Sequence, residues 1–423
     1  MKIRFYNARI LTMEEGVSII SGELHVTDCK IDYIGDAKND GTVFDREIDC
    51  ENNLLMPGFK NAHTHSAMTF LRSYADDLPL QEWLYNRVFP MEAKLTKQDQ
   101  IELAKLGILE YLTSGITANF DMYLDNMCHA VASKELGFRT VLCGSMNDFG
   151  GTVPEMEEEY YKINEVSPLV SYKLGFHAEY TTKRESIEEI ATLAHKMKEP
   201  VYLHLAETER EVNECIERYG VSPVQFLDSV GIFDYGGGGF HGVWMDEKDM
   251  DICRERSIAI VSNPSSNVKL ASGIADLVAM TEKGITLALG TDGPASNNAL
   301  DMFREMYLAA TLQKVVKQDA SVMDAKDVLR MATVGGAKAM GLTDCDVLAP
   351  GKEADIIMIN MHRPNMQPEN NIEKNIVYSG SKENVKMTMI QGKILYENGE
   401  FHLPESAEDI YQKANEIIGR LDA

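Results

Sequence analysis

The chain has 423 residues, of which 66 are acidic and 41 are basic, so its net charge is −25 at pH 7. A field of this sign repels nucleic-acid phosphates and anionic lipid headgroups, which argues against nucleic acid and membrane as partners. The hydrophobic fraction of 44% and the charged fraction of 25% are ordinary for a soluble globular protein. The length suits one large barrel with a smaller unit beside it.

Seven cysteines are scattered along the chain without a CxxC pair, and their odd number argues against a disulfide framework. The first residues lack the apolar core of a signal peptide, and no apolar run approaches the ~18 residues of a membrane span. We therefore expect reduced thiols, a cytoplasmic location and a small-molecule substrate. A homo-oligomer stays open.

Both ends of the chain predict β structure. Residues 1–54 contain short alternating runs such as Ile31-Asp32-Tyr33-Ile34, interrupted by glycines. Similar short alternating runs return after Pro350-Gly351, in segments 355–359, 376–378 and 385–390. Residues 402–423 predict a closing helix. We expect these ends to form one small, discontinuous β-sandwich-like domain from residues 1–56 and 349–423.

The middle of the chain, residues 57–348, alternates between short apolar segments and helix-like stretches. Helical periodicity is clearest in 97–114, where Ile101, Ala104 and Ile108 fall on one face. The other helical candidates are 125–136, 185–197, 246–256, 273–283, 300–316 and 323–340. The strand candidates are 55–65, 116–121, 139–145, 172–178, 201–207, 238–243, 258–264 and 286–292. Eight β/α units predict an α/β fold, a (β/α)8 TIM barrel that carries the catalytic site.

His63-Thr64-His65 ends the first barrel segment. Side chains alternate faces along a strand, so the two imidazoles point into one space. His177, His204, His241 and Asp292 lie at or near the ends of later segments, and the carboxyl ends of barrel strands meet at one mouth. Imidazole and carboxylate ligands suit Zn²⁺, with Fe²⁺ or another first-row ion as alternatives. The predicted ligands of a single metal ion are His63, His65, His204 and Asp292.

Three of these positions suggest catalytic roles. Glu207 follows His204 at the strand exit, which suits a general acid/base, although a solvated loop carboxylate is the alternative. His241 could orient hydroxide or polarise the substrate, or could be a core histidine bonded to backbone. Asp292 follows an apolar strand, where an unpaired carboxylate would be costly, so a metal partner is favoured over helix capping.

The motifs around these residues resemble the amidohydrolase superfamily, in its branch of S-adenosylhomocysteine/5′-methylthioadenosine deaminases and related chlorohydrolases. The matching segments are 57–65, 204–208, 262–270, 289–298 and 350–355, so the resemblance covers nearly the whole chain. Binuclear members carry a carboxylated lysine at the end of strand four, but Lys173 lies four residues before His177, too deep for the mouth. A single metal ion is expected.

The resemblance implies hydrolytic deamination of an aminated heteroaromatic ring, with Glu207 protonating the ring and Asp292 assisting the departure of ammonia. It also implies substrate-binding roles for Glu92, on the ribose hydroxyls, for His177, near the sugar and purine, and for Trp83, as an aromatic wall. From the residues alone, Glu92 could equally be a helix-surface charge and Trp83 a core side chain.

One departure from the family limits the substrate. Relatives that accept S-adenosylhomocysteine carry an arginine at the end of strand three, where this chain has Gly144. The following segment, 147–168, is acidic, so a substrate carboxylate finds no bidentate partner. We therefore expect adenosine or a 5′-modified adenosine, with 5′-methylthioadenosine favoured over S-adenosylhomocysteine. The rivals are a hydrolase of another amino- or chloro-heterocycle (guanine, pterin or triazine) and a non-catalytic metal-binding barrel.

Overall fold

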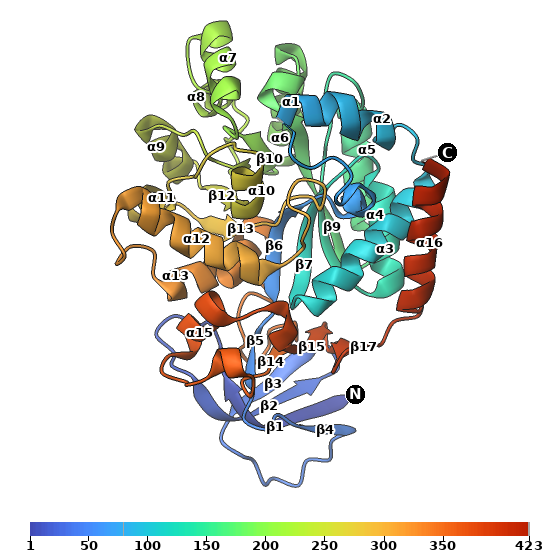
Figure 1. Cartoon of the computed structure of the whole chain (residues 1–423), viewed down its shortest axis with the longest axis vertical. Helices are drawn as coiled ribbons and strands as arrows, with labels where there is room; N and C mark the ends of the chain where they lie inside the picture. Colours follow the sequence, from blue (N-terminus) through green and yellow to red (C-terminus); the bar gives the residue numbers. More distant parts are fainter. Residues whose placement is uncertain (79, 422–423) are drawn as a thin grey trace.

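Eight parallel strands form a nearly closed barrel in the centre of the molecule (Figure 1). The computed structural model describes residues 1–78 and 80–421. Each strand overlaps one of the predicted segments, so the (β/α)8 prediction is confirmed. In order around the barrel, the strands are β6 (Phe59–Thr64), β7 (Ile116–Met122), β8 (Arg139–Cys143), β9 (Val170–Ala178), β10 (Val201–Leu205), β11 (Gly237–His241), β12 (Ile258–Ser262) and β13 (Leu287–Leu289).

The seam between β13 and β6 is closed by hydrogen bonds rather than by strand pairing. The backbone N–H of Thr291 donates to Asn61 Oδ1 at 2.8 Å. The backbone N–H of Asp292 donates to the carbonyl of His63 at 3.0 Å. This seam therefore brings Asp292 beside the first predicted metal ligand.

Helices surround the barrel, and polar caps fix where several of them begin. Thr96 and Thr208 each accept a hydrogen bond from the third residue of the helix that follows, the usual N-cap arrangement. The main helices after each strand are α3 (Lys97–Thr113), α4 (Asn126–Leu136), α5 (Val153–Asn164), α6 (Arg184–Met197), α7 (Glu209–Tyr219), α8 (Pro223–Ser229), α9 (Glu247–Glu255), α10 (Pro264–Lys269), α11 (Leu277–Glu282), α12 (Met302–Lys317), α13 (Ala325–Arg330) and α14 (Gly336–Met340).

Between β6 and α3 the chain folds into short helical turns near the mouth. These turns are η1 (Ser66–Leu71), α1 (Leu80–Trp83), η2 (Leu84–Val88) and α2 (Phe89–Glu92). They bring Trp83 and Glu92 into the same region as the strand ends.

The predicted helix 323–340 is interrupted by one π-helical turn, η4 (Met331–Gly335). Close packing explains the two glycines there. A Cβ at Gly335 would lie 2.1 Å from the carbonyl of Leu287, and one at Gly336 would lie 2.7 Å from Lys60 Cβ. The backbone of this segment therefore rests directly on the barrel.

A nine-stranded mixed sheet lies below the barrel and draws on both ends of the chain, as predicted (Figure 1). Its apolar core includes Ile3, Phe5 and Ile356. The strand order is β17 (Glu400–Phe401), β16 (Lys393–Glu397), β15 (Val385–Ile390), β14 (Ile356–Ile359), β5 (Leu54–Pro57), β1 (Lys2–Ile10), β2 (Ile20–Thr27) and β3 (Lys30–Gly35), with β4 (Arg46–Asp49) paired to β1.

Two C-terminal segments are helices that pack on the barrel. The predicted β segment 376–378 is wrong, because it lies in α15 (Ile372–Ser379), which contacts α12 and α13. Asn371 caps this helix, and Ile376 and Val377 are buried, so packing overrides their β preference. The closing helix α16 (Ala407–Leu421) contacts α3, while residues 422–423 of the prediction lie outside the described residues. The division of the chain into a small domain (1–56 plus 349–423) and a barrel domain (57–348) stays a prediction.

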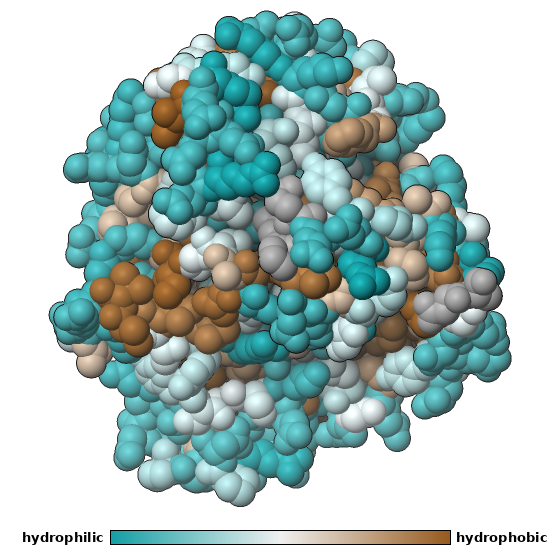
Figure 2. All heavy atoms as spheres, turned by 45° about the horizontal axis from the view of Figure 1, so that its top comes forward, coloured by the Kyte–Doolittle hydropathy of each residue, from teal (hydrophilic) through white to brown (hydrophobic). Residues whose placement is uncertain are grey.

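The surface is mostly hydrophilic, in keeping with the acidic composition (Figure 2). Figure 2 also shows a hydrophobic area on the side where α11 and α12 lie in Figure 1. Within residues 1–78 and 80–421, no helix has both the length and the apolar character needed to cross a bilayer.

Candidate active site

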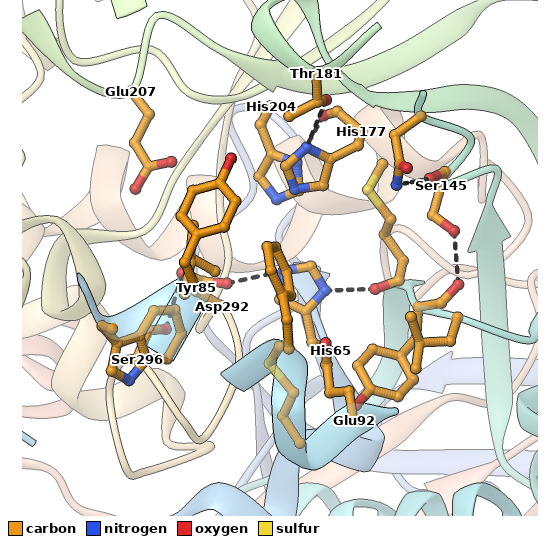
Figure 3. A pocket seen from close by; sticks show the side chains of 18 of the residues that line it. His65, Tyr85, Glu92, Ser145, His177, Thr181, His204, Glu207, Asp292 and Ser296 are labelled. Atoms are coloured by element: carbon orange, nitrogen blue, oxygen red, sulfur yellow. Dashed lines mark hydrogen bonds and ion pairs between the residues drawn. The ribbon is translucent and has the colours of Figure 1, made fainter. Parts of the chain in front are cut away.

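The carboxyl ends of five barrel strands bring their polar side chains to one mouth (Figure 3). The ring centroid of His63 lies 4.8 Å from that of His65 and 4.9 Å from that of His204. Asp292 Oδ1 lies 3.2 Å from His65 Nε2 and 3.6 Å from His63 Nε2. The four predicted metal ligands are therefore neighbours.

The hydrogen bonds of two histidines leave their Nε2 atoms directed at the mouth. His65 Nδ1 donates to the carbonyl of Met122, and His204 Nδ1 donates to the carbonyl of His177 at 2.8 Å. Such bonds fix the tautomer and ring orientation of a metal-binding histidine.

His63 supplies the test of whether a metal ion fits. Its ring is fully buried, stacked on Phe240 at 3.9 Å, and neither nitrogen has a hydrogen-bond partner in the described part of the chain. Burying an imidazole whose nitrogens have no hydrogen-bond partner costs free energy, unless a ligand binds one of those nitrogens. Potential donor atoms lie within 4.8 Å of one another in two sets that share His63. These sets are His63, His65 and Asp292, and His63, His204 and His241, so the donors fit a first-row divalent ion.

Asp292 is a buried carboxylate with a full set of donors. Its Oδ2 accepts hydrogen bonds from Ser266 Oγ at 2.5 Å and Ser296 Oγ at 2.9 Å, and its Oδ1 accepts one from the Gly293 N–H at 2.7 Å. Burial opposes its ionisation, but the hydrogen bond and charge of His65 hold the pKa of Asp292 well below its usual value. Asp292 is thus held as an anion.

Glu207 lies two residues beyond β10, at a turn fixed by another glutamate. The backbone N–H groups of Ala206 and Glu207 each donate to the Glu211 carboxylate at 2.8 Å. The side chain of Glu207 is buried and faces the mouth, with Oε2 3.8 Å from His241 Nε2 and Oε1 3.4 Å from Ser272 Oγ (Figure 3). Burial raises the pKa of Glu207. A carboxyl group with a raised pKa beside a reaction centre can both hold and release a proton.

His241 is oriented by a neighbour that the spacing of the sequence did not single out. Its Nδ1 lies 2.8 Å from Asn267 Oδ1, which accepts only an N–H donor, so Nε2 is the free nitrogen on the side of Glu207. Asn267 belongs to the segment 262–270 that resembles the family, and this segment is the signal that could have found it.

The mouth opens into a pocket that Trp83, Glu92 and His177 all line, together with every predicted ligand except His63 beneath it. Burial raises the pKa of Glu92 to about 7. His177 Nδ1 is hydrogen-bonded to Thr181 Oγ1 at 2.9 Å. The remaining wall is largely aromatic and apolar, from Met68, Leu84, Tyr85, Phe89, Met122, Tyr123, Leu124, Phe149, Tyr180 and Leu270. No motif in the sequence pointed to Tyr85 or Tyr180.

Gly144 leaves no room for a side chain. A Cβ there would lie 2.5 Å from the carbonyl of Gly175 and 2.9 Å from Tyr172 Oη. Lys173 is turned away from the mouth, and its Nζ lies 3.8 Å from Glu199 Oε2. Neither an arginine on β8 nor a bridging lysine on β9 is therefore available at the mouth.

The chain matches known proteins over almost its whole length. The profile of the Amidohydrolase family matches residues 54–395. A 5′-deoxyadenosine deaminase of Methanothermobacter thermautotrophicus is 39% identical over 393 residues, which cover 91% of each chain. A 5-methylthioadenosine/S-adenosylhomocysteine deaminase of Syntrophomonas wolfei is 38% identical over 434 residues, covering 100% of this chain and 99% of that protein. The solved structure of an adenosine deaminase of Xanthomonas campestris with bound zinc has a TM-score of 0.94 at 30% identity, covering 99% of this chain and 98% of its own. The chain belongs to the amidohydrolase family.

Proposed function

We propose that this chain is a metal-dependent hydrolytic deaminase that releases ammonia from the adenine ring of adenosine or a 5′-modified adenosine. Water adds at the ring carbon that bears the amine, the carbon–nitrogen bond breaks, and ammonia leaves. The observation that carries this proposal is the position of Glu207, a buried carboxyl group with a raised pKa at the rim of a cluster of metal-ligand side chains. The deaminase relatives, which match 91% or more of the chain, support the adenosine-type substrate.

His63, His65, His204 and Asp292 would hold one metal ion, for which we propose Zn²⁺, with Fe²⁺ or another first-row ion as alternatives. The ion supplies Lewis-acid chemistry that lowers the pKa of water to about 7. The zinc in the related adenosine deaminase structure supports this choice.

The remaining groups move protons and orient the substrate. Glu207 delivers a proton to the ring nitrogen beside the reacting carbon, and Asp292 assists the departing ammonia. The free Nε2 of His241 faces the same space and positions the attacking water. Glu92 binds the ribose hydroxyls, with Trp83 and His177 lining the nucleoside site. Gly144 stands where relatives that accept S-adenosylhomocysteine carry an arginine, so the carboxylate of that substrate has no cation to pair with there. We therefore favour 5′-methylthioadenosine over S-adenosylhomocysteine.

The test measures ammonia release by metal-loaded protein from adenosine, 5′-deoxyadenosine, 5′-methylthioadenosine and S-adenosylhomocysteine. We expect turnover of the first three, about one metal equivalent per chain, and loss of activity on chelation that is restored by Zn²⁺. Glu207→Gln should lower kcat by about 10²–10⁴-fold, the range for a general acid/base. Glu209→Gln, at an exposed position two residues away, is the matched control.

Two results would contradict the proposal. Metal-loaded protein that releases no ammonia from any adenine nucleoside would exclude the substrate class, and parallel assays with guanine, a pterin and a chlorotriazine would identify the rival heterocycle. Full activity of Glu207→Gln would exclude the assigned acid/base.

A further inference from the structure

A second hollow adjoins the active-site pocket at the end of β8. The two share Leu124, Ser145 and Asn147 as a common wall. The hollow has a volume of about 450 Å³, far more than a single water requires. Its other sides come from α4, from the loop 144–152 and from α5. It is therefore large enough to take part of a ligand that extends out of the pocket.

The hollow lies beside the end of the pocket that is remote from the chemistry. In Figure 3, Glu207 and Asp292 lie on one side of the pocket, whereas Ser145 lies on the opposite side, above Glu92. Ser145 Oγ donates to the carbonyl of Tyr123 at 2.8 Å, which fixes this wall. If the base is at Glu207 and the ribose at Glu92, as proposed, the Ser145 wall lies at the ribose end of the pocket, the end from which a 5′ substituent extends.

The charge in the hollow is negative. Glu155, Glu158 and Glu159 line it, against Lys162 as the one lining cation among the described residues. Lys162 pairs with Glu158 on the same helix, and the Glu155 carboxylate accepts a hydrogen bond from Thr152 Oγ1. Glu159 has no ion-pair partner within residues 1–78 and 80–421. Burial raises its pKa, as expected for a carboxylate without a cation.

Two further acceptors in the hollow are unsatisfied. Asn126 Nδ2 donates to Glu159 Oε2 at 3.1 Å, but Asn126 Oδ1 has no hydrogen-bond partner in the described chain. Tyr172 Oη accepts none either, its O–H group being directed at Glu159, and both residues are more than nine-tenths buried while lining the hollow. Gly144 keeps this place open, because its Cβ would approach Tyr172 Oη.

The acceptors match one kind of group. An alkylammonium carries three N–H donors, one positive charge and no acceptor. Glu159, Asn126 Oδ1 and Tyr172 Oη supply a carboxylate and two neutral acceptors at one place. A carboxylate ligand would instead meet like charge here.

We propose that this hollow binds a protonated amine on the 5′ substituent of the substrate, so that the preferred substrates are adenosines with a cationic 5′ side chain. This inference rests on the proposed deaminase function. Glu159 is the residue that determines this preference, and it acts on substrate binding rather than on the proton transfers at Glu207.

The test compares three adenosines that differ at the end of a 5′-thioether chain: 3-aminopropylthio (cationic), butylthio (neutral) and 2-carboxyethylthio (anionic). We expect kcat/KM for the amine to exceed that for the butyl compound by about tenfold, the size of one charge-assisted hydrogen bond, with the carboxylate the poorest substrate. Most of the difference should be in KM, because the amine is remote from the reacting ring.

Glu159→Gln keeps an acceptor for Asn126 and removes the charge. It should abolish the preference for the amine over the butyl compound, and thermal unfolding of the variant reports that it is folded. Glu159→Lys should raise kcat/KM for the carboxylate compound. Glu165→Gln, an exposed neutralisation at the end of α5, is the control and should change neither ratio.

The outcomes separate the two proposals. If no adenosine releases ammonia, the deaminase function itself fails. If all three thioethers are deaminated with equal kcat/KM, or if Glu159→Gln leaves the preference for the amine intact, the ammonium site is wrong while the deaminase function stands.

Discussion

Glu305 on α12 is a buried carboxyl group that joins two turns behind the mouth. It accepts a hydrogen bond from the Ser265 N–H at 2.9 Å and one from Asn297 Nδ2 at 3.3 Å. The residue after Ser265 and the residue before Asn297 are the two serines that donate to Asp292. Glu305 therefore positions the hydroxyl donors of the proposed metal ligand without touching it.

Burial raises the pKa of Glu305 to about 8, whereas a glutamate in an unfolded chain has a pKa of ~4.3. The folded protein thus keeps a proton that the unfolded chain releases. The contribution of this proton to the free energy of unfolding is fully present below pH ~4.3 and is lost progressively as the pH rises toward 8. We expect Glu305→Gln, which cannot ionise, to gain stability relative to the wild type between pH 5 and 8, by about 3–5 °C in melting temperature.

Thermal unfolding at pH 5, 6, 7 and 8 measures this difference. Glu282→Gln, at an exposed position, is the control and should follow the wild type. A Glu305→Gln curve parallel to the wild-type curve at every pH would show that Glu305 is ionised in the folded protein.

At the scale of elements, α16 covers the outer face of α3. Ile410, Ala414, Ile417 and Leu421 are the buried residues of α16 and recur at helical spacing. Ion pairs flank this stripe, with Lys105 of α3 2.8 Å from Glu405 just before α16, and Arg420 of α16 paired to Asp99 of α3. The closing helix is thus part of the barrel's outer layer, although it follows the small sheet in the sequence.

Ile410→Ala should destabilise the protein by about 2–5 kcal/mol, because Ile410 is fully buried and its loss leaves a cavity. Gln412→Ala removes an exposed side chain from the same helix and should change stability by less than about 0.5 kcal/mol. Chemical denaturation of both variants measures the difference. Equal stability of the two would mean that α16 contributes little to the packing of α3.

At the scale of the whole molecule, a buried ion pair joins the barrel to the small sheet. Arg139 at the start of β8 donates to Asp355, just before β14, through Nε at 2.7 Å and Nη2 at 3.0 Å. Asp355 Oδ1 also accepts the N–H of Gln391 at 2.8 Å. Although burial opposes it, the charge of Arg139 lowers the pKa of Asp355. This contact fixes the sheet against the end of the barrel opposite the mouth.

Arg139→Met should destabilise the protein by about 3–5 kcal/mol, because it removes the cation that is hydrogen-bonded to the buried Asp355 carboxylate. The double variant Arg139→Met/Asp355→Asn removes both charges and keeps an acceptor for Gln391, so it should recover part of that loss. Denaturation of the two variants and the wild type measures the coupling. If the double variant is less stable than Arg139→Met, the unpaired charge of Asp355 is not the cause of the destabilisation.

The barrel was predictable because its signals are local. Each strand is a short apolar run, and the histidines stand where those runs end, so chain order alone brings His63, His204 and Asp292 to one mouth. The ammonium hollow was not predictable, because Asn126, Glu159 and Tyr172 meet only through the packing of α4 and α5 on β9. The prediction of β structure for 376–378 was wrong for a similar reason, because packing against α12 and α13 buries Ile376 and Val377 in a helix.

The pairing of β5 with β14 imposes an order on synthesis. Pro57 and Leu55 find their partners Ile356 and Met358 only after the whole barrel has been translated. At ~5–20 residues per second, this interval is roughly 15–60 s on the ribosome. During that time β5, buried in the finished sheet, presents a bare apolar edge, the kind of surface that aggregates or recruits chaperones. The barrel can close early, but its small sheet is completed last.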